Sequence, residues 1–196
     1  MKYRTLFSPL TVRGLTLKNR VVVSAMGCLM IGRDRKVSQQ LADYLGERAK
    51  GGVGLIYSPC AAVDTGSCPE GMLAISTDEI GESHKLLTEA VHAGGAKCAA
   101  QLWQGSAIAF PARVYEPSET VLPAALYPAL NGKDLVVPPM TKEEIRYIVD
   151  CYGAAAARAV RAGYDMVEVH CAHGYLPHMF LNPATNRRTD EYGGSL

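Results

Sequence analysis

Three times along the chain, a helix-like stretch ends at glycine and is followed directly by a short apolar run. The closing glycines and the apolar runs that follow them are Gly51-Gly52 with Val53–Tyr57, Gly94-Gly95 with Ala96–Leu102, and Gly163 with Tyr164–His170. Glycine just beyond a helix adopts the left-handed backbone conformation that terminates it. A nearly continuous apolar run is typical of a strand that is buried on both faces of a parallel sheet. The pattern therefore predicts an α/β fold in which helices alternate with parallel strands.

Further elements can be placed around this repeat. Residues Ser38–Lys50 and Asp78–Ala93 are predicted to be helical, and a capping box at Thr141–Glu144 begins a third helix that runs to about Ala162. The third helix should bury one face, made of Ile145, Ile148, Val149, Tyr152 and Ala156. Its length and spacing favour a helix that covers a sheet.

Strands are also expected ahead of the first helix. Arg20–Ala25 forms an apolar run, and Leu10–Val12 and Leu15–Leu17 flank Arg13-Gly14 as a two-residue hairpin would. Counting Arg20–Ala25, four strands should lie near Val21–Ala25, Gly54–Ser58, Lys97–Gln101 and Met166–His170. We expect them to be parallel and adjacent in that order.

Two parallel architectures can hold these units. A Rossmann sheet carries a glycine-rich turn after its first strand, and Ala25–Leu29 lacks the GxGxxG pattern. A (β/α)₈ TIM barrel needs no such turn and places its chemistry at the carboxyl ends of the strands, so it is favoured. Such a barrel has eight strands and about 250 residues. We therefore expect residues 1–196 to be the N-terminal half of a TIM-barrel domain, with the hairpin, the first four βα units and an insertion over Ala107–Pro139.

Composition excludes several other classes of protein. Lys and Arg number 20 and Asp and Glu 19, so the net charge of +1 offers no electrostatic footprint for nucleic acid or for an anionic membrane surface. The longest stretch without these charged residues, Val169–Asn186, holds three histidines and is not expected to span a membrane. The six cysteines form no CxxC pair, which favours reduced thiols and a cytoplasmic location.

The end of the fourth predicted strand carries the residues best suited to chemistry. His170 and His173 are followed by Gly174, which allows a sharp turn, and by Tyr175. Two imidazole N–H groups can hold one carbonyl or carboxylate oxygen, and a nearby phenol can deliver a proton. These three side chains are the predicted catalytic group.

Other interpretations of the histidines remain open. His170, His173 and His178 could supply three nitrogens to a metal, which would favour a metal-dependent lyase or hydrolase. However, no acidic residue lies between Glu168 and Asp190 to complete or orient such a site, so no metal is expected. A non-catalytic half-barrel fragment is the other alternative, because half a barrel leaves two open sheet edges. His84 and His92, on the second predicted helix, are expected to be ordinary hydrogen-bonding residues.

Several motifs together resemble the old yellow enzyme and 2,4-dienoyl-CoA reductase family of NADH:flavin oxidoreductases, which bind FMN. They are Leu6–Leu10, Leu17–Arg20, Ala90–Gly95, Gln101–Trp103, His170–Leu176, Phe180-Leu181 and the long block Asn186–Ser195. The resemblance covers essentially all 196 residues. Trp103 and Leu176–His178 are most similar to the long enoate-reductase and bile-acid enone oxidoreductase type.

The resemblance implies roles for individual residues. FMN would lie along the backbone of Ala25, Met26 and Gly27, contact Cys60, and receive hydrogen bonds at its pyrimidine edge from Gln101. His170 and His173 would hold the substrate carbonyl oxygen, and Tyr175 would protonate the substrate α-carbon. These assignments are carried over from the family and not from spacing.

The resemblance also implies the reaction. NAD(P)H would reduce FMN, which would reduce the activated C=C bond of an enone, enoate or enoyl-CoA-type small molecule, or catalyse the reverse desaturation. The long relatives carry a 4Fe-4S cluster and FAD beyond the barrel, and a homo-oligomer is left open.

Several positions depart from the family pattern. Gly27 stands where the family often has Thr or Cys, so tuning of the flavin by that side chain is lost, and Cys28 would substitute only in part. The common Gln-Leu-x-His-x-Gly-Arg pattern after the third strand becomes Gln101-Leu-Trp-Gln104-Gly-Ser106 here. The second departure predicts an altered polar rim around the substrate.

Overall fold

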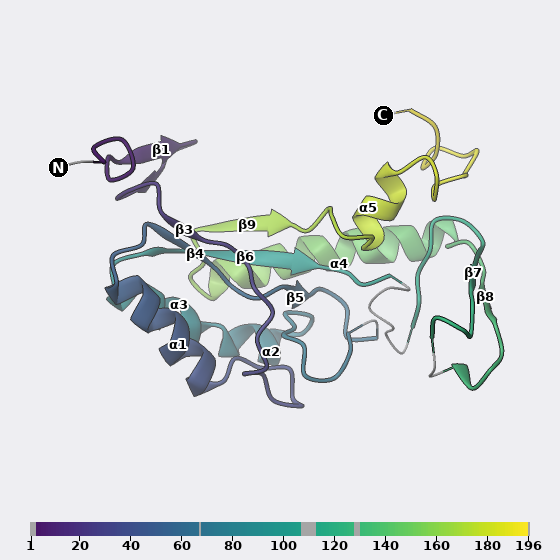
Figure 1. Cartoon of the computed structure of the whole chain (residues 1–196), viewed down its shortest axis with the longest axis horizontal. Coiled ribbons are helices and arrows are strands. Elements are labelled where there is room, and N and C mark those ends of the chain that lie inside the picture. The colour runs from purple at the N-terminus through teal and green to yellow at the C-terminus, as the bar shows by residue number, and fades with distance from the viewer. Residues whose placement is uncertain (1–2, 67, 107–112, 128–129, 196) are drawn as a thin grey trace.

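Four parallel strands lie side by side at the centre of the structure (Figure 1), a computed structural model that describes residues 3–66, 68–106, 113–127 and 130–195. They are β3 (Val22–Val23), β4 (Leu55–Tyr57), β6 (Lys97–Trp103) and β9 (Met166–Val169). β4 pairs with β3 and β6, and β6 pairs with β9, in each case in parallel. The predicted strands, their order and their direction are confirmed.

A short strand that the sequence did not reveal completes this sheet. After β4 the chain leaves the edge of β6 and returns as β5 (Ala61–Ala62), which pairs in parallel with Leu102 and Trp103 near the end of β6. Two alanines carry no strand signal of their own, because the pairing depends on the neighbouring strand. The detour over residues 58–60 brings Cys60 beside the carboxyl end of β6.

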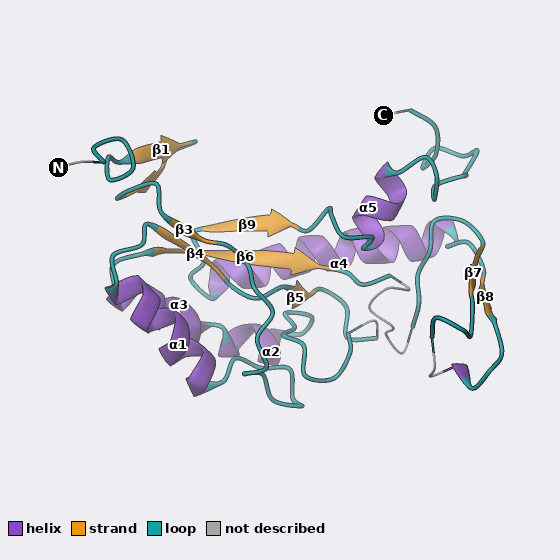
Figure 2. Ribbon diagram, in the orientation of Figure 1, coloured by secondary structure: helices purple, strands orange, loops and turns teal. Residues whose placement is uncertain are grey.

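Helices pack on one face of the sheet (Figure 2). They are α1 (Gln39–Lys50), α2 (Asp78–Ser83), α3 (Lys85–Ala93) and α4 (Lys142–Arg161). The side chains of Ile56, Cys98, Ala100 and Leu102 point to this face and join residues of α1, α3 and α4 in the main hydrophobic core. Alternate residues of the strands therefore face the helices, as a parallel sheet under a helical layer requires.

The second predicted helix is divided at His84. This residue ends α2 and precedes α3, and its ring is fully buried. Its Nδ1 is 2.7 Å from the Tyr164 hydroxyl and its Nε2 is 2.8 Å from the carbonyl oxygen of Ala74. These partners hold the side chain inside the protein, and neither is visible in the local helical pattern.

The third predicted helix is confirmed in its cap and corrected in its buried face. Thr141 Oγ1 accepts from the Glu144 amide at 3.1 Å, and Glu144 Oε2 accepts from the Thr141 amide at 2.9 Å. Ile145 and Ile148 are buried, but Val149 is 61% exposed. Val149 lies about 100° around the helix from Ile148, which turns it away from the described part of the core.

The N-terminal hairpin packs against the opposite face of the sheet at its amino-terminal end. β1 (Leu10–Val12) pairs in antiparallel fashion with β2 (Leu15–Leu17). Arg13 and Gly14 have φ angles of 45° and 87°, as a type I′ turn requires, so the hairpin prediction is confirmed. Leu17 forms a small core with Leu55 and Ala99, at the amino-terminal end of the sheet.

Two further elements were not predicted. The expected insertion contains a second hairpin, β7 (Thr120–Leu122) and β8 (Leu135–Val137), and a short helix α5 (Leu176–Leu181) follows β9. Residues 107–112 and 128–129 of the insertion lie outside the described residues. None of the described helices is long and apolar enough to cross a lipid bilayer.

The contact between α1 and the end of α3 requires a glycine at position 94. A Cβ atom there would lie 2.4 Å from the Ala49 Cβ and 2.7 Å from the Lys50 amide nitrogen. We expect Gly94→Ala to lower the free energy of unfolding by about 1–3 kcal/mol, because the helices would have to separate. Gly153→Ala is the matched control, since a Cβ on this α4 residue meets no atom within 4 Å. Urea denaturation measures the stability of both variants, and equal stability would contradict this packing.

Candidate active site

The predicted site residues gather at the carboxyl end of the sheet. The backbone of Ala25, Met26 and Gly27 follows β3, Cys60 follows β4, Gln101 lies within β6, and His170 follows β9. In Figure 1 β6 and β9 both point toward α5, which begins directly after Tyr175. Since parallel strands end at the same edge, residues that are far apart in the sequence meet there.

His170, His173 and Tyr175 lie in mutual contact. The ring centroids of His170 and His173 are 5.1 Å apart, and that of Tyr175 is 4.9 Å from His170 and 6.4 Å from His173. All three pairs meet edge to face. The structure therefore brings the three predicted catalytic side chains together.

The loop that carries these side chains makes a sharp left-handed turn. Gly174 has a φ of 74°, as the sequence suggested, and His173 has a φ of 57°. Positive φ is uncommon for residues other than glycine and occurs often at functional sites. Ser106 donates a hydrogen bond to the Gly174 carbonyl oxygen, while His178 Nδ1 accepts from the Gly174 amide at 2.8 Å. The turn is thus held from both sides.

Ser106 and Gln104 do not line a polar rim, contrary to the sequence-based expectation. Both side chains are almost completely buried, and the Gln104 carbonyl oxygen accepts from the Leu176 amide at 3.3 Å. The Ser106 hydroxyl and the main-chain carbonyl of Gln104 bind the backbone of the loop that carries His170, His173 and Tyr175. The sequence held no signal for this, because the two partners are about 70 residues further along the chain.

The imidazoles of His170 and His173 are hydrogen-bonded to each other. His170 Nδ1 accepts from the Ala172 amide at 3.2 Å, which leaves its Nε2 to carry the proton. That Nε2 lies 3.2 Å from His173 Nδ1 and donates to it. Only the Nε2–H of His173 then remains outside the pair, whereas the sequence had suggested two N–H donors directed at one oxygen.

Burial sets the protonation of the site. It lowers the pKa of His170, and the neighbouring His173 lowers it further, so the neutral imidazole is favoured. Burial also raises the pKa of Tyr175, followed by the effect of Cys60. The phenol is therefore held in its protonated form, as a proton donor requires.

Cys60 lies against the same group of side chains. It is half-buried and packs in a cluster with Trp103 and Tyr175, whose rings meet edge to face at 5.2 Å. Burial raises the pKa of both Cys60 and Cys28, so neither thiol is activated as a thiolate. Cys60 is therefore linked to the site by its packing against Tyr175 and Trp103 and not by thiol reactivity.

The backbone after β3 is open to a bound group. Met26 is 52% exposed, and a Cβ placed on Gly27 would meet no atom within 4 Å. On the same edge of the sheet, the half-buried Gln101 amide donates to Glu168. An open stretch of backbone beside an amide and a thiol fits the flat ring of FMN, with its polar pyrimidine edge.

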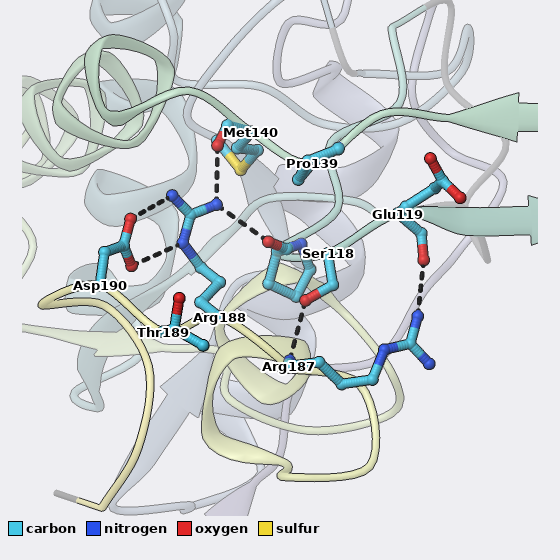
Figure 3. A pocket seen from close by; sticks show the side chains of 9 residues that line it. Ser118, Glu119, Pro139, Met140, Arg187, Arg188, Thr189 and Asp190 are labelled. Atoms are coloured by element: carbon cyan, nitrogen blue, oxygen red, sulfur yellow. Dashed lines mark hydrogen bonds and ion pairs between the residues drawn. The ribbon is translucent and has the colours of Figure 1, made fainter.

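Two cavities of similar volume are lined by other described residues. One, of about 460 Å³, is lined mainly by apolar side chains of α4 and α5 and by residues Glu191–Ser195. The other, of about 430 Å³, lies between residues 117–119 and 187–190 (Figure 3). Neither contains His170, His173 or Tyr175, so we identify the site from its chemistry and not from cavity size.

Figure 3 shows the contacts of Arg188, which belongs to the Asn186–Ser195 motif. Arg188 forms an ion pair with Asp190 at 2.6 Å, and it donates to the carbonyl oxygens of Pro117 at 2.9 Å and Met140 at 2.7 Å. The ion pair lowers the pKa of Asp190 to about 2. This family motif therefore ties the insertion after β6 to the segment after α5.

Among the described residues, no group of three or more His, Cys, Asp or Glu side chains is arranged to hold a metal ion. His178, the third nitrogen in the metal interpretation, is used by the Gly174 amide. His84 and His92 form internal hydrogen bonds, His84 as above and His92 with Asp165 at 2.8 Å.

Comparisons with known proteins show which family the chain matches. The family model described as "NADH:flavin oxidoreductase / NADH oxidase family" matches residues 5–196. A probable NADH-dependent flavin oxidoreductase, YqiG of Bacillus subtilis, is 37% identical over 99% of this chain and 51% of its own length. A metal reductase of Desulforamulus reducens is 38% identical over 97% of this chain and 28% of its own length.

A solved structure shows the same likeness. The old yellow enzyme from Pichia sp. AKU4542 matches with a TM-score of 0.87 at 31% identity, over 97% of this chain and 52% of that one. The chain spans about half the length of YqiG and of this enzyme, and it corresponds to the N-terminal half of the old yellow enzyme barrel. The chain therefore belongs to the NADH:flavin oxidoreductase / NADH oxidase family, the family of the old yellow enzymes.

Proposed function

We propose that the protein is an FMN-dependent oxidoreductase that passes hydride from NAD(P)H through FMN to an activated C=C bond, or runs the reverse desaturation. The substrate class is an enone, enoate or enoyl-CoA-type small molecule. The observation that carries the proposal is the contact of His170, His173 and Tyr175 at the carboxyl end of the sheet, the same end at which the open backbone of Met26 and Gly27 follows β3. Oxygen-binding imidazoles and a protonated phenol are what reduction of such a bond needs.

Different residues would bind FMN and the substrate. Bound FMN supplies the hydride chemistry, and Ala25, Met26, Gly27, Cys60 and Gln101 are the residues of this chain that would hold it. A substrate carbonyl oxygen would accept the Nε2–H of His170 in place of His173, and the Nε2–H of His173 would complete its binding. These donors stabilise the negative charge that develops on the oxygen as hydride reaches the β-carbon.

Tyr175 completes the addition of hydrogen across the double bond. Its phenol gives a proton to the α-carbon, so the substrate gains one hydride and one proton. The raised pKa of Tyr175 keeps this proton in place until the substrate binds.

The finer assignments are also proposals. The complete domain would be a closed (β/α)₈ barrel, which the edge strands β3 and β9 support, since each pairs with one strand only among the described residues. The long enoate-reductase type, with a 4Fe-4S cluster and FAD outside the barrel, is supported by Trp103 and Leu176–His178. The six free cysteines support a cytoplasmic location, and a homo-oligomer is proposed on the resemblance alone.

The visible absorption spectrum of the protein tests the proposal. We expect the intact protein to be yellow, with the visible absorption bands of flavin, and to release FMN on denaturation. A protein that stays colourless after reconstitution with FMN would contradict the assignment. Bound zinc or iron without flavin would favour the metal-dependent lyase or hydrolase instead, and iron and FAD together with FMN would support the long type.

A further inference from the structure

A layer of polar side chains lies directly beneath the candidate site. Tyr57 on β4, Gln101 on β6 and Glu168 on β9 occupy the face of the sheet opposite the helices, because their neighbours Ile56, Ala100 and Leu102 face the main core. The layer below, toward the N-terminal hairpin, is apolar and contains Leu55 and Ala99. Polar groups in this position need partners, and here they bind one another.

Glu168 is the centre of this layer. Gln101 and Glu168 are paired in the register of β6 and β9, and Gln101 Nε2 donates a hydrogen bond to Glu168 Oε1. Burial, and after it the charge of Glu168 and a hydrogen bond to it, raise the pKa of Tyr57. The carboxylate of Glu168 thus interacts with side chains of β6, its neighbouring strand, and of β4, one strand further across the sheet.

The contact decides how the Gln101 amide is oriented. A carboxylate only accepts hydrogen bonds, so the amide must turn its NH₂ group, and not its oxygen, toward Glu168. A free glutamine amide can exchange the two by a half-turn. With Glu168 present, Oε1 and the second hydrogen of Nε2 are the groups left for a ligand.

We propose that Glu168 is a positioning residue that fixes the Gln101 amide in the orientation needed to bind the pyrimidine edge of FMN. This inference rests on the proposed function. The pyrimidine edge alternates carbonyl oxygens with an N–H group, so an amide matches it in one orientation and opposes it in the other. Glu168 acts through Gln101 and has no direct contact with the reacting atoms.

The test is Glu168→Gln in the FMN-loaded protein. The substituted amide has the same shape but can both donate and accept, so it no longer selects one orientation of Gln101. We expect the dissociation constant for FMN, measured by quenching of its fluorescence, to rise about tenfold, the size of a hydrogen bond to a charged group. The visible absorption bands of the bound FMN should shift as well.

A double-mutant cycle separates positioning from a general structural role. In a Gln101→Ala background, Glu168→Gln should change the dissociation constant for FMN by less than about twofold, because the side chain it orients is gone. Since any cost to folding is present in both backgrounds, a tenfold loss that persists there would overturn the proposal. Tyr57→Phe is the matched control: it removes another polar partner of Glu168, and FMN binding should not change.

The outcomes also distinguish the two proposals. If the unsubstituted protein binds no FMN, the proposed function fails. If it binds FMN and Glu168→Gln binds it equally well with an unchanged spectrum, only the positioning role fails.

Discussion

Replacing Tyr175 with phenylalanine is expected to slow alkene reduction by about 10²–10⁴-fold, the usual contribution of a positioned general acid. Reduction of FMN by NAD(P)H should proceed at its normal rate, because that step does not use a proton from the phenol. The substitution keeps the ring that packs on Trp103 and His170, so the loop should retain its shape.

Stopped-flow measurement of the two half-reactions provides the test. Equal slowing of both by Tyr175→Phe would indicate a structural role and contradict the proposal. His170→Ala and His173→Ala serve as comparisons, since each would remove a proposed hydrogen bond to the substrate oxygen. These two should weaken substrate binding as well as slow alkene reduction.

The second large effect concerns stability and pH. Burial lowers the pKa of His84 from 6.5 to about 4, so the folded protein holds this imidazole neutral where the unfolded chain would protonate it. The unfolded state therefore binds more protons between about pH 6.5 and 4. Stability from this residue is present above pH 6.5 and is lost as the pH falls to about 4, by about 3 kcal/mol at 1.4 kcal/mol per pKa unit.

Urea denaturation at a series of pH values measures this dependence. His84→Gln is the control, because glutamine can still hydrogen-bond to Tyr164 and Ala74 but does not titrate. We expect this variant to be less stable than the unsubstituted protein at pH 8 and to lose much less stability on acidification. An identical slope in both proteins would show that His84 does not set the dependence.

Local patterns in the sequence were sufficient for much of the fold. The Arg13-Gly14 turn, the Thr141 cap and the four apolar strands each depend on residues within a few positions of one another, and the structure confirms all of them. The positions of His170, His173 and Tyr175 at one strand end followed from the same kind of pattern. These three side chains contact one another because they lie close together along the chain.

Tertiary structure alone decided the remaining features. The partners of His84, Ser106 and Glu168 lie 80, 68 and 67 residues away in the sequence. The periodicity of apolar residues along a helix or strand indicates only which face of that element a residue occupies. The packing of elements determines which side chains contact that face. The sequence by itself therefore determined the N-terminal hairpin, the four main strands, the cap at Thr141 and the place where the His170–Tyr175 loop begins. Only packing between distant strands decided how that loop is held, which way Gln101 is turned, and why His84 is kept neutral.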